Sequence, residues 1–188
     1  MHDAGMIVLP THRLFEGVAQ YDSATLIQTL QGCFDANTVG SGPAQAATVW
    51  EQIELKDEQG MIGLYCPVDD TWVVANLNDT GRTKMAEIAG NQSSDWQGLG
   101  VSLLHRLIMD TLLGEVDLPK PTYVHQVQEV VEELASDQDT NKFGLAALVM
   151  PATLDHIKAI SEHGERMPAK STYFYPKLLA GLVINPLT

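Results

Sequence analysis

The spacing of apolar residues changes several times along the chain and predicts a mixture of strands and helices. Residues 6–9 form a short apolar run closed by Pro10, which removes a backbone donor, so we expect a buried strand followed by a loop. Asp and Ser at the start of residues 22–36 can cap a helix over that range. Residues 37–42 are predicted as loop, and a helix over residues 43–53 starts at a proline, which suits the first helical turn.

From residue 61 the hydrophobic pattern changes to the alternation that is typical of strands. Residues 61–67 and 71–77 flank a short acidic turn, and this arrangement predicts an antiparallel hairpin. Residues 101–113 repeat apolar side chains at helical spacing and are followed by Gly114, so they predict a helix that ends at glycine. The remaining expected elements are helices at 80–89, 128–134 and 151–160 and strands at 122–124, 143–149, 172–175 and 182–184.

These elements predict a single domain over residues 1–188 with an α+β or mixed α/β fold. No internal repeat, low-complexity tract or linker divides the sequence. The hairpin argues against a purely parallel sheet, whereas the strand, helix, strand order of residues 122–149 favours some parallel pairing. The expected architecture is therefore one mixed sheet with helices packed on it.

Charge narrows the classes of partner. The chain has 24 acidic residues against 11 Lys and Arg, and its net charge of -13 disfavours binding to nucleic acid or to anionic lipid. No apolar run approaches the roughly 20 residues that span a bilayer, and the polar residues 1–5 do not form a secretory signal. We expect an acidic, cytoplasmic protein that binds neither nucleic acid nor membranes, and a second copy of the chain stays open as a partner.

Cysteine and histidine residues are too scattered to predict a metal site or a catalytic set. Cys33 and Cys66 lie far apart without metal-ligand spacing, and we interpret both as reduced, half-buried thiols. His105 lies in a predicted helix without a ligating partner four residues away, so we interpret it as structural. No Ser, His and acid grouping can be assembled from spacing. Catalytic residues and cofactors therefore stay undetermined, and no metal is predicted.

The first candidate for chemistry is the segment Pro10-Thr11-His12-Arg13. It combines a hydroxyl with two cationic groups directly after a predicted buried strand, where α/β folds commonly hold ligands. A small anionic ligand would fit there. The alternative is that His12 and Arg13 bond to the backbone or pair with some of the surplus carboxylates.

The second candidate lies in residues 164–172. This segment approaches the phosphate-loop pattern, but Ala169 replaces the second glycine and a predicted helix precedes the segment, so we reject it as a nucleotide loop. Arg166, Lys170 and Lys177 nevertheless gather three of the few basic residues within a short stretch. This cluster predicts anion binding or an interface, and the alternative is a solvated basic patch that neutralises acidic neighbours.

Two segments of the sequence are distinctive: Val8-Leu9-Pro10-Thr11-His12-Arg13-Leu14 and residues 163–177, His-Gly-Glu-Arg-Met-Pro-Ala-Lys-Ser-Thr-Tyr-Phe-Tyr-Pro-Lys, which we call the closing segment. Together they resemble the uncharacterised family known as domain of unknown function 1015. The order of elements between them is also similar, so the resemblance covers the whole chain but only the C-terminal part of the family pattern. Full-length members carry an Asp-Gly-His-His-Arg-Tyr motif upstream, and it does not occur here.

The resemblance implies two alternative functions. The upstream motif is similar to one in the ParB and sulfiredoxin-like group, which includes kinases of free serine, so the parent protein would be a small-molecule phosphotransferase. Under that hypothesis Thr11, His12, Arg13, Lys170 and Ser171 would line one wall of a cleft and hold phosphate or carboxylate groups. The competing hypothesis is a structural or dimerisation module in which the closing segment threads back against the sheet as a clasp.

The position of two side chains separates these hypotheses. If Lys170 and His12 converge on one open cleft, ligand binding is favoured. If they lie apart, or form salt bridges beneath aromatic side chains, the clasp is favoured.

Overall fold

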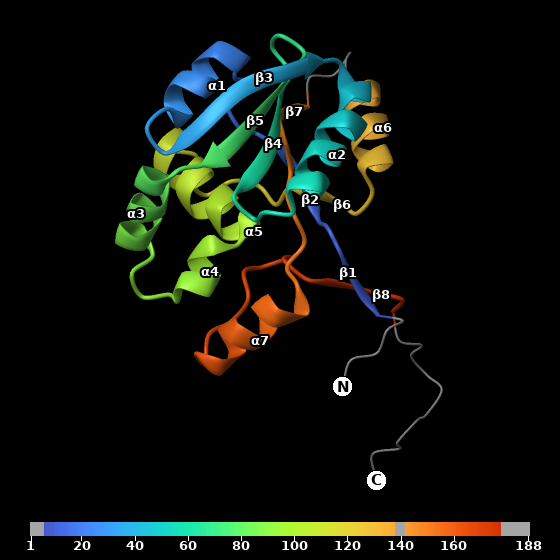
Figure 1. Cartoon of the computed structure of the whole chain (residues 1–188). Helices are drawn as coiled ribbons and strands as arrows, with labels where there is room; N and C mark the ends of the chain where they lie inside the picture. The colour runs from blue at the N-terminus through green and yellow to red at the C-terminus, as the bar shows by residue number, and fades with distance from the viewer. Residues whose placement is uncertain (1–5, 138–141, 178–188) are drawn as a thin grey trace.

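The computed structural model describes residues 6–137 and 142–177 and has a central six-stranded sheet (Figure 1). The strand order is β3-β5-β4-β7-β2-β6, and every ladder in this sheet is antiparallel. The expected α+β class is confirmed. The strands of this sheet are β2 (His12–Glu16), β3 (Phe34–Ser41), β4 (Met61–Cys66), β5 (Thr71–Leu77), β6 (Thr122–Val124) and β7 (Phe143–Leu148).

Helices cover both faces of this sheet, so apolar side chains are buried on each face. One core contains residues of α1, α3 and the helix labelled η2, and the other contains residues of α2 and α6. Figure 1 shows α2 and α6 on one side of the sheet and α1 and α3 on the other. The bounds are α1 (Ser23–Leu30), η1 (Pro43–Gln45), α2 (Ala46–Lys56), α3 (Asp79–Ile88), α4 (Ser94–Gly98), α5 (Gly100–Ser102), η2 (Leu103–Leu113), α6 (Val127–Asp137) and α7 (Leu154–Glu162).

Several predicted elements are confirmed. The hairpin is β4 paired with β5, and the helix that follows Pro43 is η1 continued by α2. The helix predicted over residues 101–113 is α5 continued by η2, and Gly114 ends it with a left-handed φ of 70°. The spacing in η2 is that of a π-helix, since the amide of Gly114 donates to the carbonyl of Met109, five residues earlier.

Two loop predictions were wrong. Residues 37–42 were expected to be loop, but β3 occupies most of them as an edge strand whose exposed positions tolerate polar residues. The helix predicted to reach residue 36 ends at Leu30 instead.

The region after Pro10 was also expected to be loop, but it is β2, the most buried strand near the start of the chain. Pro10 therefore separates two strands and does not end strand structure.

The strand, helix, strand unit exists, but its predicted parallel pairing was wrong. β6 and β7 both run antiparallel to β2 and flank it on opposite sides. They therefore point in the same direction without pairing with each other, because β2 lies between them. Within the described residues no named strand forms a parallel ladder.

A second, two-stranded sheet lies below the main body (Figure 1). β1 (Ile7–Leu9) pairs antiparallel with β8 (Tyr173–Tyr175), so the two distinctive sequence segments meet here. The strand expected at residues 6–9 is therefore present but not buried, since Ile7 is 52% exposed. The strand predicted at 182–184 lies outside the described residues.

No helix in the described part of the chain is long and apolar enough to cross a membrane. Cys33 and Cys66 are free thiols, as expected, but both are buried, whereas half-burial was predicted. Burial is also the main cause that raises the pKa of the Cys66 thiol to about 12.

Candidate functional site

Successive side chains of a strand point to opposite faces of the sheet. His12 and Arg13, the two cationic residues of the first candidate, are neighbours in β2 and therefore lie on opposite faces. The ring of His12 contacts Trp50 of α2 edge to face, with ring centroids 4.7 Å apart. Arg13 points to the other face, where its Nε donates to Nε2 of His105 in η2 at 3.0 Å. The two residues therefore cannot line one cleft.

The guanidinium of Arg13 is fully buried and bonds mainly to the backbone. Its Nη1 donates to the carbonyl of Thr11, and its Nη2 donates to the carbonyl of Lys170 at 3.0 Å. Burial lowers the pKa of Arg13 to about 10, so the group stays charged at neutral pH. Among the described residues it forms no ion pair, so neutral acceptors and the nearby ring of Tyr123 surround this charge.

His12 is buried without hydrogen bonds. It is 0% exposed, and neither ring nitrogen has a partner among the described residues. Burial, followed by the charge of Arg13, lowers the pKa of His12 from 6.5 to about 3. This histidine is therefore neutral at pH 7 and acts as a packing residue against Trp50.

His105 has a polar role that sequence reasoning missed. Its Nε2 accepts the hydrogen bond from Arg13, so in the neutral ring the proton is assigned to Nδ1. Burial, and then Arg13, lowers the pKa of His105 from 6.5 to about 4. The ring also lies edge to face against Phe15 at 5.8 Å. Helical spacing in the sequence could not predict this role, because the partner of His105 is Arg13 on β2.

Side-chain contacts attach the beginning of the closing segment to α4. The carboxylate of Glu165 accepts from the amide and the hydroxyl of Ser93, the N-cap of α4. The indole Nε1 of Trp96 donates to the carbonyl of Arg166 at 3.1 Å. Farther along, the buried hydroxyl of Ser171 donates to the carbonyl of Pro168 at 2.7 Å and closes a local turn. Ser171 therefore stabilises the segment and is not exposed to a ligand.

Aromatic stacking holds the last part of the closing segment. The rings of Tyr173 and His125 stack with centroids 3.7 Å apart. His125 Nδ1 lies 3.0 Å from the carbonyl of Pro10 and 3.4 Å from the buried hydroxyl of Thr11. Lys177 Nζ lies 3.9 Å from the centroid of the Tyr173 ring. This stack joins the loop after β6 to both strands of the small sheet.

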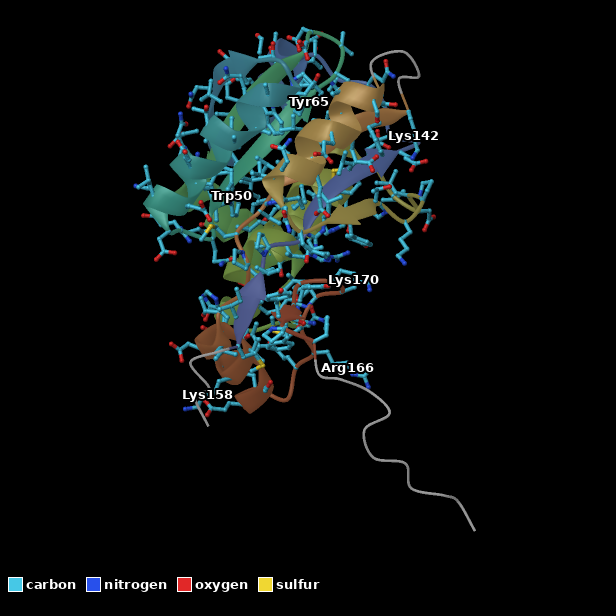
Figure 2. The ribbon with its side chains drawn as sticks, turned by 90° about the vertical axis from the view of Figure 1, so that its right-hand side faces the viewer. Trp50, Tyr65, Lys142, Lys158, Arg166 and Lys170 are labelled. Atoms are coloured by element: carbon cyan, nitrogen blue, oxygen red, sulfur yellow. The ribbon has the colours of Figure 1, made fainter. Side chains whose placement is uncertain are left out.

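The structure thus divides the seven predicted ligand-binding residues into two groups. Thr11, His12, Arg13 and Ser171 are buried, and each has a packing or hydrogen-bonding role inside the protein. Arg166, Lys170 and Lys177 are exposed on the closing segment and form no ion pair within the described part of the chain. Figure 2 shows Lys170 and Arg166 on the closing segment, well separated from Trp50, the contact of His12.

A pocket of about 220 Å³ opens next to the Arg13 contacts. It lies between α4, the helix formed by α5 and η2, β6 and the closing segment. No sequence pattern predicts that these residues lie together, because α4, α5, η2, β6 and the closing segment supply them. The lining consists of Trp96, Val101, Ser102, His105, Arg106, Tyr123, Pro168 and Ala169.

Comparisons with known proteins do not identify this arrangement: no family model, no curated protein and no solved structure matches the chain. The described residues contain no group of three or more His, Cys, Asp or Glu side chains that could hold a metal ion.

Proposed function

We propose that this chain is a supporting module, equivalent to the C-terminal part of a protein like those of domain of unknown function 1015, in which the closing segment is a structural clasp. The observation that carries the proposal is the hydrogen bond from Arg13 to the carbonyl of Lys170. A buried guanidinium that bonds to a carbonyl of a distant segment fixes that segment against the sheet.

The separation of Lys170 from His12 supports the clasp over a shared ligand cleft. Lys170 contributes a backbone carbonyl on one face of β2, whereas His12 is enclosed on the other face. A wall that holds phosphate groups would present its cations to an open space. Arg13 instead directs its donors to Thr11, His105 and Lys170.

The free thiols favour a reducing compartment, so we place the module in the cytoplasm.

One observation favours a second function, an anion-binding wall of a phosphotransferase-like protein. Arg166, Lys170 and Lys177 are exposed and lack carboxylate partners in the described part of an otherwise acidic chain. Under this function phosphate or pyrophosphate should raise the unfolding temperature, and the variant Lys170→Ala should lose the shift. Unchanged unfolding temperatures with both anions would exclude this second function.

Limited trypsin digestion tests the clasp, because Arg166 and Lys170 are exposed cleavage sites within the closing segment. In Arg13→Lys the charge remains, but the three donors of lysine radiate from one nitrogen and cannot reproduce the contacts that Arg13 makes from three separate nitrogens. We expect cleavage at these two sites to accelerate at least about tenfold, the factor given by 1.4 kcal/mol of local opening. The exposed Arg82 offers a matched control, Arg82→Lys, which should digest like the unmodified chain. Equal digestion of Arg13→Lys and the control would contradict the clasp.

A further inference from the structure

The pocket beside Arg13 has a polar base that the supporting role does not use. Ser102 is 1% exposed, and its hydroxyl has no hydrogen-bond partner among the described residues. A buried hydroxyl without a partner is unfavourable, because it has given up its hydrogen bonds to water. His105, three residues farther along the helix, also lines the pocket. A ligand oxygen that reached the base of the pocket would satisfy the hydroxyl.

Positively charged side chains lie in and beside the wall of this pocket, although the chain as a whole is strongly acidic. Arg106 is the charged residue in the lining, and no carboxylate belongs to the lining. Arg13 lies directly behind the wall, since it contacts both His105 and Tyr123, which line the pocket. Lys120 Nζ lies 5.8 Å from the centroid of the same Tyr123 ring. The field at this position therefore favours an anion.

The walls of the pocket suit a flat apolar group. Trp96 and Tyr123 contribute aromatic surface, and Val101, Pro168 and Ala169 contribute aliphatic surface. The volume of about 220 Å³ is smaller than the roughly 300–1,000 Å³ of pockets for drug-sized ligands. One aromatic ring, or two fused rings, with one charged substituent is the size that fits.

The helix that supplies the polar residues has a local geometry that often marks functional sites. η2 follows Ser102 directly and has π spacing, which is rare and is found frequently where a helix contributes to a site. Within it His105 and Arg106 project toward the pocket region, while Asp110 pairs with Arg106 at 2.9 Å. The pairing leaves other guanidinium donors of Arg106 available.

From these observations we infer that the pocket binds a small planar aromatic carboxylate. The ring would lie between Trp96 and Tyr123, and the carboxylate would accept from the Ser102 hydroxyl and from Arg106. This binding site goes beyond the supporting role and does not depend on it.

The three tryptophans of the chain allow a direct test by nitrogen-15 NMR of the full chain. The indole N–H signals of Trp50, Trp72 and Trp96 report separate positions, and Trp50 and Trp72 are buried away from the pocket. Benzoate and indole-3-acetate should move the Trp96 signal saturably, with a Kd on the order of 1 mM for so small a ligand. The Trp50 and Trp72 signals should stay in place.

The uncharged analogues benzamide and indole-3-acetamide test the requirement for negative charge. They should bind at least about threefold more weakly, as loss of one partly solvated charge contact predicts. Equal shifts with acids and amides would overturn the inference. Failure of either acid to move the Trp96 signal would also overturn it.

Two variants place the ligand in the pocket. Ala169→Phe fills the pocket from an exposed position and should abolish the Trp96 shift, whereas Ala24→Phe on α1 should not change it. Arg106→Gln should weaken acid binding about threefold, whereas Arg82→Gln on α3 should leave it unchanged. Undiminished binding to Ala169→Phe would contradict the assignment of the site.

Discussion

The guanidinium of Arg13 and the main-chain carbonyl of Lys170 are hydrogen-bonded at 3.0 Å across 157 positions of sequence. The bond connects the most buried early strand to the closing segment. Because the same guanidinium also bonds to Thr11 and His105, one side chain satisfies acceptors from three separate parts of the chain. Its removal should therefore affect more than one element.

Arg13→Met should lower the free energy of unfolding by about 3 kcal/mol. The substitution keeps most of the buried volume but leaves three acceptors without donors, and each lost buried hydrogen bond has a cost of about 1 kcal/mol or more. Urea unfolding followed by circular dichroism measures the change. Arg82→Met, at an exposed position of α3, should change the free energy by less than about 0.5 kcal/mol. A loss as small as that of the control would show that the Arg13 contacts do not stabilise the fold.

Glu165→Gln should loosen the closing segment without unfolding the sheet. The carboxylate of Glu165 accepts two bonds from Ser93, and a neutral amide accepts more weakly. Amide hydrogen exchange should therefore accelerate in residues 163–171 while the exchange of β4 and β5 stays unchanged. Glu162→Gln, at the exposed end of α7, provides the control. Equally accelerated exchange in all elements, or unchanged exchange in residues 163–171, would contradict a local attachment.

Acid should destabilise the fold through His12 and His105. Burial lowers their pKa values from 6.5 to about 3 and about 4, so below pH 6.5 the unfolded chain takes up protons that the folded chain does not. Their contribution to stability is therefore complete above pH 6.5 and falls as the pH decreases. For each histidine the loss approaches about 1.4 kcal/mol per pH unit.

His12→Leu isolates one of these two contributions. Leucine cannot bind a proton. The free energy of unfolding of His12→Leu, relative to that of the unmodified chain, should therefore rise by about 1.4 kcal/mol for each pH unit below pH 6. Urea unfolding at pH 7, 6 and 5 gives the difference at each pH. In the unmodified chain, the ring signals of His12 should not titrate between pH 7.5 and 4.5 in an NMR experiment. A difference that does not change with pH would show that His12 takes up its proton equally in the folded and unfolded states, and would contradict a neutral, buried ring.

Gly81→Ala should destabilise the packing of α3. A Cβ at this position would lie 2.2 Å from the carbonyl oxygen of Cys33, and backbone cannot move aside as a flexible side chain can. We expect a loss of about 2 kcal/mol, as for other overpacked sites. Gly98→Ala is a matched control at the end of α4, because nothing lies within 4 Å of the added carbon. Similar midpoints for Gly81→Ala and the control in urea would contradict the close approach.

Local sequence signals predicted the elements whose pairing or packing is also local. The β4–β5 hairpin follows from alternation around a short turn, and the helix that ends at Gly114 follows from regular apolar spacing. β2 and β3 were missed because both contain polar residues, which do not form the apolar pattern typical of a strand. In β2 the polar His12 and Arg13 are buried only because helices from other parts of the chain cover both faces of the sheet. Local propensity contains no information about such covering.

The candidate site was predictable in its parts but not in its arrangement. The sequence indicated that Arg13 and the closing segment are unusual, and the structure joins them through a backbone carbonyl. The sequence did not indicate that Ser102, His105 and Tyr123 share a pocket, because they come from different elements and form no motif. Backbone acceptors and shared cavities leave no signature in residue type or spacing.

The position of β2 in the sheet has a consequence for how the protein forms on the ribosome. β3, β4 and β5 can pair as soon as residue 77 has been synthesised, but β2 needs β6 and β7, which end at residues 124 and 148. A strand near the start of the chain that pairs with strands synthesised much later raises the contact order and delays completion of the sheet. Leu14 and Phe15, which are buried in the folded protein, therefore lack their final partners until β6 and β7 have been synthesised. Until residue 148 has emerged, this exposed apolar surface is open to chaperone binding and to aggregation.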